Sequence, residues 1–174
     1  KSRSFDVAGT TDDALYLHYR NAVSSSSTIP GAPFSYEIPL EDGTYNIKLH
    51  FIEPYYGAPG GVKGSVGARV FHVDIEGQRL LNNYDIFATD GSAKAVVKAF
   101  NNISINDGKL DIAFTSVVNN AIISAIEFEN ISTTPPSEPV LTLSPSELIF
   151  DGVKSTTIGP KELTLRNDGG KELV

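Results

Sequence analysis

A two-residue alternation of apolar and polar side chains over residues 45–53 is the feature that most constrains the fold. Successive side chains of a β-strand point to opposite faces, so this alternation predicts a half-buried strand. The side chains expected to face the core are Tyr45, Ile47, Leu49 and Phe51. Similar alternation returns in short segments at 34–38, 69–76, 95–105 and 110–114. No segment shows a convincing helical period, which favours an all-β fold.

Glycine, asparagine and aspartate cluster between these segments and predict the turns. Glu41-Asp42-Gly43 is expected to close a hairpin between segments 34–38 and 45–53, and Asn106-Asp107-Gly108 predicts another turn. The parity of the apolar positions changes near Asn101-Asn102, which predicts a β-bulge. Many short strands with such turns favour an antiparallel β-sandwich over a barrel.

A proline-rich segment at 132–139 predicts an extended linker between two domains. Beyond it, the apolar runs at 140–143, 148–150 and 163–165 are interpreted as the first strands of an immunoglobulin-like β-sandwich. Such a domain needs about 100 residues, more than the chain has left. We therefore expect one β-sandwich at 1–131, the linker at 132–139 and part of a second domain at 140–174, with the biological chain continuing further. The absence of Met at position 1 also indicates a piece of a longer protein.

Charge and composition exclude several classes of function. The formal net charge is −7 and the sequence pI is about 4.9, whereas a nucleic-acid-binding protein needs a basic face. No apolar run approaches the roughly 18 residues of a membrane span, so this segment is not expected to cross a membrane. The absence of cysteine excludes disulfides and thiolate metal sites.

Two adjacent tyrosines, Tyr55 and Tyr56, follow the strand at 45–53 and precede a segment with five glycines at 57–67. Aromatic rings at a strand end suit sugar binding, because the C–H faces of a pyranose stack on rings while its hydroxyls need hydrogen-bond partners. The alternative interpretation is two tyrosines of a surface loop, one of them packed on the edge of the core.

Other polar residues suggest chemistry less strongly. His50 and His72, with Asp74, are a candidate metal site if their strands are neighbours, but solvent-facing polar pairs are commoner. Glu53 and Asp74 are a candidate glycosidase pair, although we expect Glu53 to anchor the tyrosine loop by accepting backbone N–H bonds. Asp12-Asp13 and Asp90-Gly91 are interpreted as turn residues rather than calcium ligands. We therefore expect no metal, no cofactor and no catalytic residue.

Several separated motifs within Thr10–Phe128 together resemble the malectin family. In chain order they are Phe34-Ser35-Tyr36-Glu37-Ile38-Pro39, Gly43-Thr44-Tyr45, Leu49-His50-Phe51-Ile52-Glu53, Arg69-Val70-Phe71, Tyr84-Asp85-Ile86 and Ile123-Ser124-Ala125-Ile126-Glu127. The resemblance implies a jelly-roll β-sandwich, and animal malectin binds short glucose oligosaccharides through loops at one end. The segment after Val140 resembles the immunoglobulin-like modules that follow malectin domains in large bacterial surface proteins.

The resemblance also implies positions for a binding site. The paired loop aromatics of the family fall on Tyr55 and Tyr56, and its sugar-binding aspartate falls on Asn119. An amide can still bond to hydroxyls, but it lacks the charge of a carboxylate. Tyr19 matches an earlier family tyrosine loosely, and Arg20 beside it is a further candidate for bonding to sugar hydroxyls. The first strand of the family and the tyrosine that follows it are expected upstream of Lys1.

Together these observations predict a non-catalytic, lectin-like module of a larger secreted or cell-surface protein, with an oligosaccharide or other glycan, of glucose type in this resemblance, as its partner. The alternative is a structural or assembly module of an extracellular filament or adhesin, which would bind other proteins and no sugar. A third hypothesis, a glycoside hydrolase, finds no nucleophile with an adjacent base in this sequence.

Overall fold

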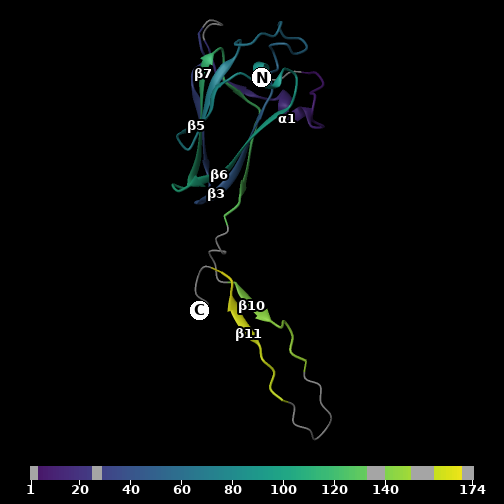
Figure 1. The fold of residues 1–174 in the computed structure, drawn as a ribbon, viewed down its shortest axis with the longest axis vertical. Helices are drawn as coiled ribbons and strands as arrows, with labels where there is room; N and C mark the ends of the chain where they lie inside the picture. The colour runs from purple at the N-terminus through teal and green to yellow at the C-terminus, as the bar shows by residue number, and fades with distance from the viewer. Residues whose placement is uncertain (1–3, 25–28, 133–139, 150–158, 170–174) are drawn as a thin grey trace. The chain divides into compact units, whose positions relative to one another are not determined.

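The computed structural model describes residues 4–24, 29–132, 140–149 and 159–169, and the chain divides into two compact units, Lys1–Ile131 and Ser132–Val174 (Figure 1). The first unit contains two larger antiparallel sheets and one small sheet. The first sheet has the order β2 (Phe34–Pro39), β7 (Lys109–Val118), β4 (Val70–Ile75) and β5 (Gln78–Tyr84). The second has the order β6 (Val96–Ile105), β3 (Gly43–Phe51) and β9 (Ala125–Asn130), and the small sheet pairs β1 (Arg20–Asn21) with β8 (Ile122–Ile123). The predicted all-β antiparallel sandwich is confirmed.

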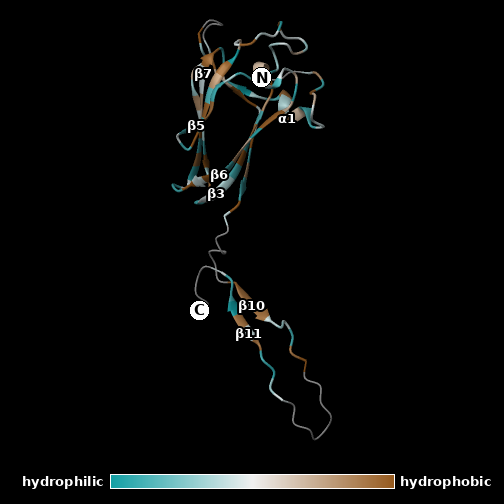
Figure 2. Cartoon of the chain, in the orientation of Figure 1, coloured by the Kyte–Doolittle hydropathy of each residue, from teal (hydrophilic) through white to brown (hydrophobic). Residues whose placement is uncertain are grey.

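The two larger sheets bury one shared hydrophobic core (Figure 2). All the predicted inward-facing residues of the strand at 45–53 are buried, with Tyr45 the most accessible at 4%. Phe51 of the second sheet contacts Phe71 and Tyr84 of the first, with ring centroids 5.9 and 5.5 Å apart. Full burial of each such side chain contributes about 1.5–3 kcal/mol, so the apolar residues of this alternation contribute strongly to stability.

The hairpin predicted between residues 34–38 and 45–53 is wrong. β2 pairs with β7, and β3 pairs with β6 and β9, so the turn at 41–43 is a corner that crosses from one sheet to the other. The corner lies against the turn between β6 and β7, where the Leu40 N–H donates to the Gly108 carbonyl at 3.1 Å. A local turn signal is the same for a hairpin and for a crossing corner, because strand pairing depends on packing of distant residues. Here the Phe34 ring stacks on Phe114 of β7 at 4.7 Å, which fixes the partner of β2.

The bulge predicted at Asn101-Asn102 is confirmed. Along the β3–β6 pair, Tyr45 lies opposite Ile103 but Ile47 lies opposite Phe100, so β6 carries an extra residue. Asn102 has a φ of 58°, a left-handed conformation that asparagine tolerates better than most residues.

The expectation of no helix is wrong for two short helices, α1 (Asp13–Leu17) and α2 (Ile86–Asp90). Each is a single turn of five residues, too short to show a helical period in the sequence. Each begins after an aspartate that caps it: Asp12 accepts from the Leu15 N–H and Asp85 from the Ala88 N–H. The capping role of Asp12 agrees with its interpretation as a turn residue.

The N-terminal segment covers part of the outer face of the second sheet. The Tyr16 hydroxyl lies 2.9 Å from His50 Nδ1, and the opposite ring nitrogen of His50 lies 3.3 Å from a Glu127 oxygen. Tyr16 also packs with Val7 and Ile52 in a small second core. Burial raises the pKa of Tyr16, and the charges of Asp12 and Glu127 add to this. His50, predicted on a solvent-facing surface, is therefore buried under a segment that comes earlier in the chain.

In the second unit, β10 (Leu141–Ser144) and β11 (Thr164–Asn167) form an antiparallel pair. They correspond to the strands predicted at 140–143 and 163–165. Leu148 and Ile149, predicted as strand, lie outside regular structure, and Phe150 falls outside the described residues. The proline-rich linker also falls almost wholly outside them, at 133–139. The immunoglobulin-like fold of this unit stays a prediction.

Candidate functional site

The buried carboxylate of Glu53 holds the backbone at Tyr55 and Tyr56. It follows β3 by two residues, its accessible surface is 0%, and its Oε1 accepts from the N–H groups of Tyr55 at 3.0 Å and Tyr56 at 2.9 Å. The anchoring role predicted for Glu53 is confirmed. Because these bonds reach backbone donors, Glu53 holds the turn without using the side chains at positions 55 and 56.

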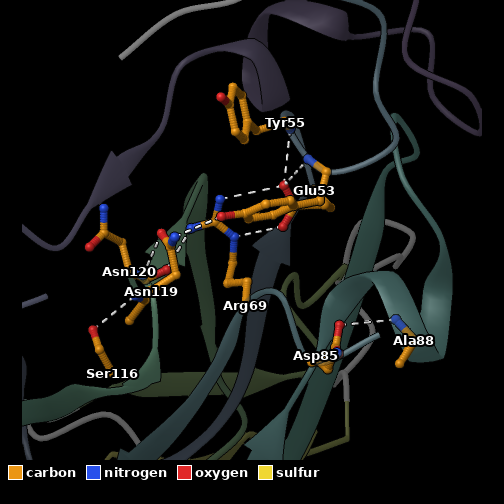
Figure 3. A network of polar contacts seen from close by, with 11 residues as sticks. Glu53, Tyr55, Arg69, Asp85, Ala88, Ser116, Asn119 and Asn120 are labelled. Carbon is orange, nitrogen blue, oxygen red and sulfur yellow. Dashed lines mark hydrogen bonds and ion pairs between the residues drawn. The ribbon is translucent and has the colours of Figure 1, made fainter. Parts of the chain in front are cut away.

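Arg69 balances the charge of Glu53. Its Nε donates to Glu53 Oε2 at 2.6 Å, and its Nη1 donates to the carbonyl oxygen of Asn120 at 2.6 Å (Figure 3). Only 6% of Arg69 is exposed, so the ion pair is almost dry. The sequence places Arg69 in one of the family motifs but predicts no contact for it. One basic residue before a strand does not show which distant groups it will bind. Its contacts join the end of β3, the start of β4 and the loop after β7.

The two tyrosine rings meet at a right angle. Their centroids are 5.2 Å apart with an interplanar angle of 81°, and Tyr55 is 36% exposed. The Arg69 guanidinium carbon lies 5.5 Å from the centre of the half-buried Tyr56 ring. The rings therefore form an aromatic corner, defined here as Tyr55 and Tyr56.

Asn119 reaches the aromatic corner from the loop after β7. Its Nδ2 donates to the Tyr56 hydroxyl at 2.7 Å, and its Oδ1 accepts from the Asn120 N–H at 2.9 Å. The φ of Asn119 is 58°, and its carbonyl oxygen accepts from the Gly31 N–H at 2.9 Å. Three of the residues proposed from the sequence, Tyr55, Tyr56 and Asn119, thus form one contiguous group.

The glycine-rich segment after the aromatic corner is closely packed. The Val62 N–H donates to the Tyr55 carbonyl at 2.9 Å, and a side chain on Gly61 would overlap that same oxygen. A side chain on Gly64 would overlap the ring of Phe87 in α2. The segment ends where the Gly67 N–H donates to Asp85 Oδ2 at 2.6 Å. These glycines permit the close approach of backbone and ring.

A second cluster of charges fixes α2, against which that segment packs. Asp90 accepts from the Tyr84 hydroxyl at 2.8 Å, from Thr89 Oγ1 at 2.8 Å and from Lys98 Nζ at 3.1 Å. Burial alone would raise the pKa of Asp90, but the hydrogen bonds from Lys98, Tyr84 and Thr89 outweigh it and hold the pKa below its usual range. This role replaces the calcium site considered for Asp90.

Tyr19 and Arg20 occupy the segment around β1. Tyr19 is half-buried and packs against the main core. The Arg20 guanidinium lies over the rings of Phe34 and Tyr36, 4.4 and 4.9 Å from their centres. The Arg20 charge thus makes cation–π contacts with two rings of β2. Direct contacts of Tyr19 and Arg20 with a sugar stay predictions.

The structure does not bring the other candidate groups together. β3 and β4 belong to different sheets, so the condition for a metal site at His50 and His72, that their strands are neighbours, is not met. His72 accepts from the Asn83 N–H, and Asp74 pairs with Arg79 at 2.9 Å. No group of three His, Cys, Asp or Glu side chains that suits a metal ion occurs among the described residues. Glu53, the other half of the glycosidase pair, is fully enclosed.

The model of the malectin domain matches residues 1–135, and the chain belongs to the malectin family. A probable LRR receptor-like serine/threonine-protein kinase of Arabidopsis thaliana is 36% identical over 67 residues, which are 38% of this chain and 6% of the relative. The chain thus corresponds to a small part of that much longer protein.

Solved structures share the fold at low sequence identity. A β-glucuronidase of Bacteroides uniformis matches with a TM-score of 0.60 and 19% identity, over 75% of this chain and 13% of the enzyme. The ANXUR1 extracellular domain of Arabidopsis thaliana matches with a TM-score of 0.58 and 20% identity, over 80% of this chain and 35% of that domain. Part of an enzyme and an extracellular domain therefore share the fold of this chain. Within the parts of the chain that the structure describes, no helix has the length and apolar character of a membrane span.

Proposed function

We propose that this chain is a non-catalytic carbohydrate-binding module of a larger secreted or cell-surface protein, with the aromatic corner as its binding site. The observation that carries the proposal is the perpendicular pair Tyr55 and Tyr56, held on backbone bonds to an enclosed carboxylate. A sugar ring stacks on one tyrosine and meets the edge of the other, while polar groups beside the rings bond to its hydroxyls.

The burial of Glu53 supports a binding role over a catalytic one. A glycosidase needs a carboxylic acid within reach of the glycosidic oxygen and a second carboxylate opposite it. Glu53 is inaccessible and paired with Arg69, so its charge serves the loop. The likeness to a β-glucuronidase covers 13% of that enzyme and supports a shared fold, not a shared reaction.

A site built on two partly exposed rings is expected to bind weakly, with Kd on the order of 10 μM to 1 mM. Repeated modules in a longer surface protein would raise the effective affinity through multivalency. An ectodomain relative such as ANXUR1 is consistent with a place outside the cell.

A glycan-array screen of the full 174-residue chain, with hits confirmed by calorimetry, tests this function. The wild type should bind a defined glycan class, and Tyr55→Ala/Tyr56→Ala should not, although its backbone anchors at Glu53 remain. Val66→Ala is the matched control, because Val66 lies in the same segment and is 75% exposed. It should bind as the wild type does. Silence from a folded wild type would reject the proposal in favour of a structural or assembly module that binds proteins.

A further inference from the structure

The orientation of the Asn119 amide is determined by its neighbour. The backbone N–H of Asn120 only donates, so the atom of Asn119 that lies 2.9 Å from it has to be the carbonyl oxygen. The amide nitrogen therefore faces the Tyr56 hydroxyl at 2.7 Å and donates to it. The backbone of Asn119 is left-handed, and its carbonyl oxygen accepts from the Gly31 N–H, so the backbone that carries the amide is held in place.

This orientation fixes the direction of the Tyr56 hydroxyl. A phenol oxygen that accepts from an amide keeps its own proton for a different acceptor. The hydroxyl proton of Tyr56 therefore points away from Asn119. The Arg69 guanidinium carbon lies 5.5 Å from the centre of the Tyr56 ring, and a guanidinium has no acceptor atom for that proton.

The charges near the aromatic corner are already matched. Glu53 and Arg69 neutralise each other below the rings, and Arg69 is further committed to the Asn120 carbonyl. The Asn119 side chain is an uncharged amide, whereas a carboxylate at this position would attract a hydroxyl proton. The polar group that Tyr56 and Asn119 offer to a ligand is a hydrogen-bond donor, which is matched by an acceptor oxygen of a saccharide.

We propose that Asn119 is a positioning residue which makes the Tyr56 hydroxyl a hydrogen-bond donor to the ligand, so that the site selects saccharides with an acceptor oxygen beside the stacked face. This inference rests on the proposed carbohydrate binding for its ligand but not for the direction of the hydroxyl. Asn119 itself does not need to touch the sugar.

Neutron diffraction of the deuterated chain without ligand tests the direction of the hydroxyl. One amide deuteron of Asn119 should point to the Tyr56 oxygen, and the Tyr56 deuteron should point elsewhere. A Tyr56 deuteron directed at Asn119 would overturn the inference. This measurement needs no sugar. It therefore decides the direction of the Tyr56 hydroxyl even if the chain binds no carbohydrate.

Calorimetry with maltose and its monodeoxy and monodeoxyfluoro derivatives tests the consequence for binding, because fluorine accepts but cannot donate. At the position that meets Tyr56, the deoxy sugar should bind the wild type about 5–10-fold more weakly than maltose, and the fluoro sugar less than about 3-fold more weakly. Equal losses for fluoro and deoxy sugars at every position would contradict the proposal. If maltose does not bind, the glucose-type ligand is rejected, and the neutron result alone decides the role of Asn119.

Asn119→Asp reverses the polarity with little change of structure. Aspartate tolerates the left-handed backbone and still accepts from the Asn120 N–H, but its second oxygen takes the Tyr56 proton. The fluoro derivative should then bind as weakly as the deoxy derivative. Tyr56→Phe is the matched control, and it should weaken maltose and remove the difference between the two derivatives. A purely structural role of Asn119 would weaken all three sugars equally.

Discussion

The Glu53–Arg69 pair shows how two charged residues become part of the interior. Each is nearly inaccessible, and each spends its remaining hydrogen bonds on backbone groups of neighbouring loops. Buried pairs of this kind cost desolvation, so their net contribution to stability is small while both partners are present. Their value here is positional, since they join the loops that form the aromatic corner.

Removal of one partner should therefore be costly. Glu53→Gln leaves the Arg69 charge buried without a counter-charge, and we expect the free energy of unfolding to fall by about 3 kcal/mol in urea denaturation. Glu37→Gln is the control, because Glu37 pairs with Lys109 on the surface and 69% of its side chain is exposed. It should change stability by less than about 0.5 kcal/mol. Similar losses for both variants would show that Arg69 is solvated or paired elsewhere.

Asp90 should make stability depend on acid pH. Its pKa in the folded chain lies below the ordinary value, so its contribution is complete above the ordinary pKa and is lost as the pH falls through the folded value. Asp90→Asn should be less stable than wild type by about 1 kcal/mol at pH 7, and the difference should shrink towards pH 3. Urea midpoints measured from pH 3 to 7 check this. Parallel curves for the two proteins would exclude Asp90 as the titrating group.

At the scale of elements, the glycine-rich segment behaves as a packed support for the aromatic corner. Gly61 and Gly64 lie where a side chain would strike the Tyr55 carbonyl or the Phe87 ring, and Asp85 receives the far end of the segment. The α2 helix thus supports the candidate site through the glycine-rich segment. Asp85, which caps α2, accepts from the Gly67 N–H of the segment, and Asp90, its last residue, accepts from Lys98 of β6.

Two alanine substitutions in this segment should separate packing from local strain. Gly61→Ala forces the backbone at Tyr55 to move, so glycan affinity should fall at least about 10-fold. Gly67, by contrast, has a positive φ of 81°, and a methyl group added there meets nothing, so Gly67→Ala should cost about 1 kcal/mol of stability and leave affinity unchanged. Calorimetry and thermal denaturation of both variants give the two readouts. Unchanged affinity in Gly61→Ala would mean that the segment does not position the rings.

Most strands could be predicted from the sequence because alternation is local. The inward faces of β3, β4 and β7, the bulge at Asn102 and the anchoring by Glu53 all follow from residues within one short window. The partner of β2, the burial of His50 and the role of Arg69 depend on residues far away in the chain, which no local pattern encodes. The two capped turns of helix were missed because a helix of five residues leaves no period.

At the scale of the molecule, the sandwich is assembled from distant segments. β3 is the centre of its sheet and pairs with β9 near the end of the first unit, so that Leu49 lies opposite Ile126. β2 and β7 are joined in the same way across most of that unit. Such pairing requires closure of long loops before many contacts form.

The first unit should therefore refold slowly for its size. We expect stopped-flow refolding on the order of milliseconds to seconds, as for other sandwiches dominated by non-local pairing. The chain has seven tyrosines and no tryptophan, so tyrosine fluorescence is the intrinsic probe. Far-UV circular dichroism provides the control for strand formation. Complete recovery of both signals within about 100 μs would contradict this expectation.

The backbone anchoring of the tyrosine turn has a consequence for how this surface can diversify. Glu53 binds the N–H groups at positions 55 and 56, and Val62 binds the carbonyl of residue 55, so the fold of the turn requires no particular side chain at position 55. Mutation can change the residue at position 55 while Glu53 and Val62 still hold the backbone of the turn. A library randomised at position 55 should therefore yield mostly folded proteins, which makes this position a natural starting point for engineering the glycan binding proposed above.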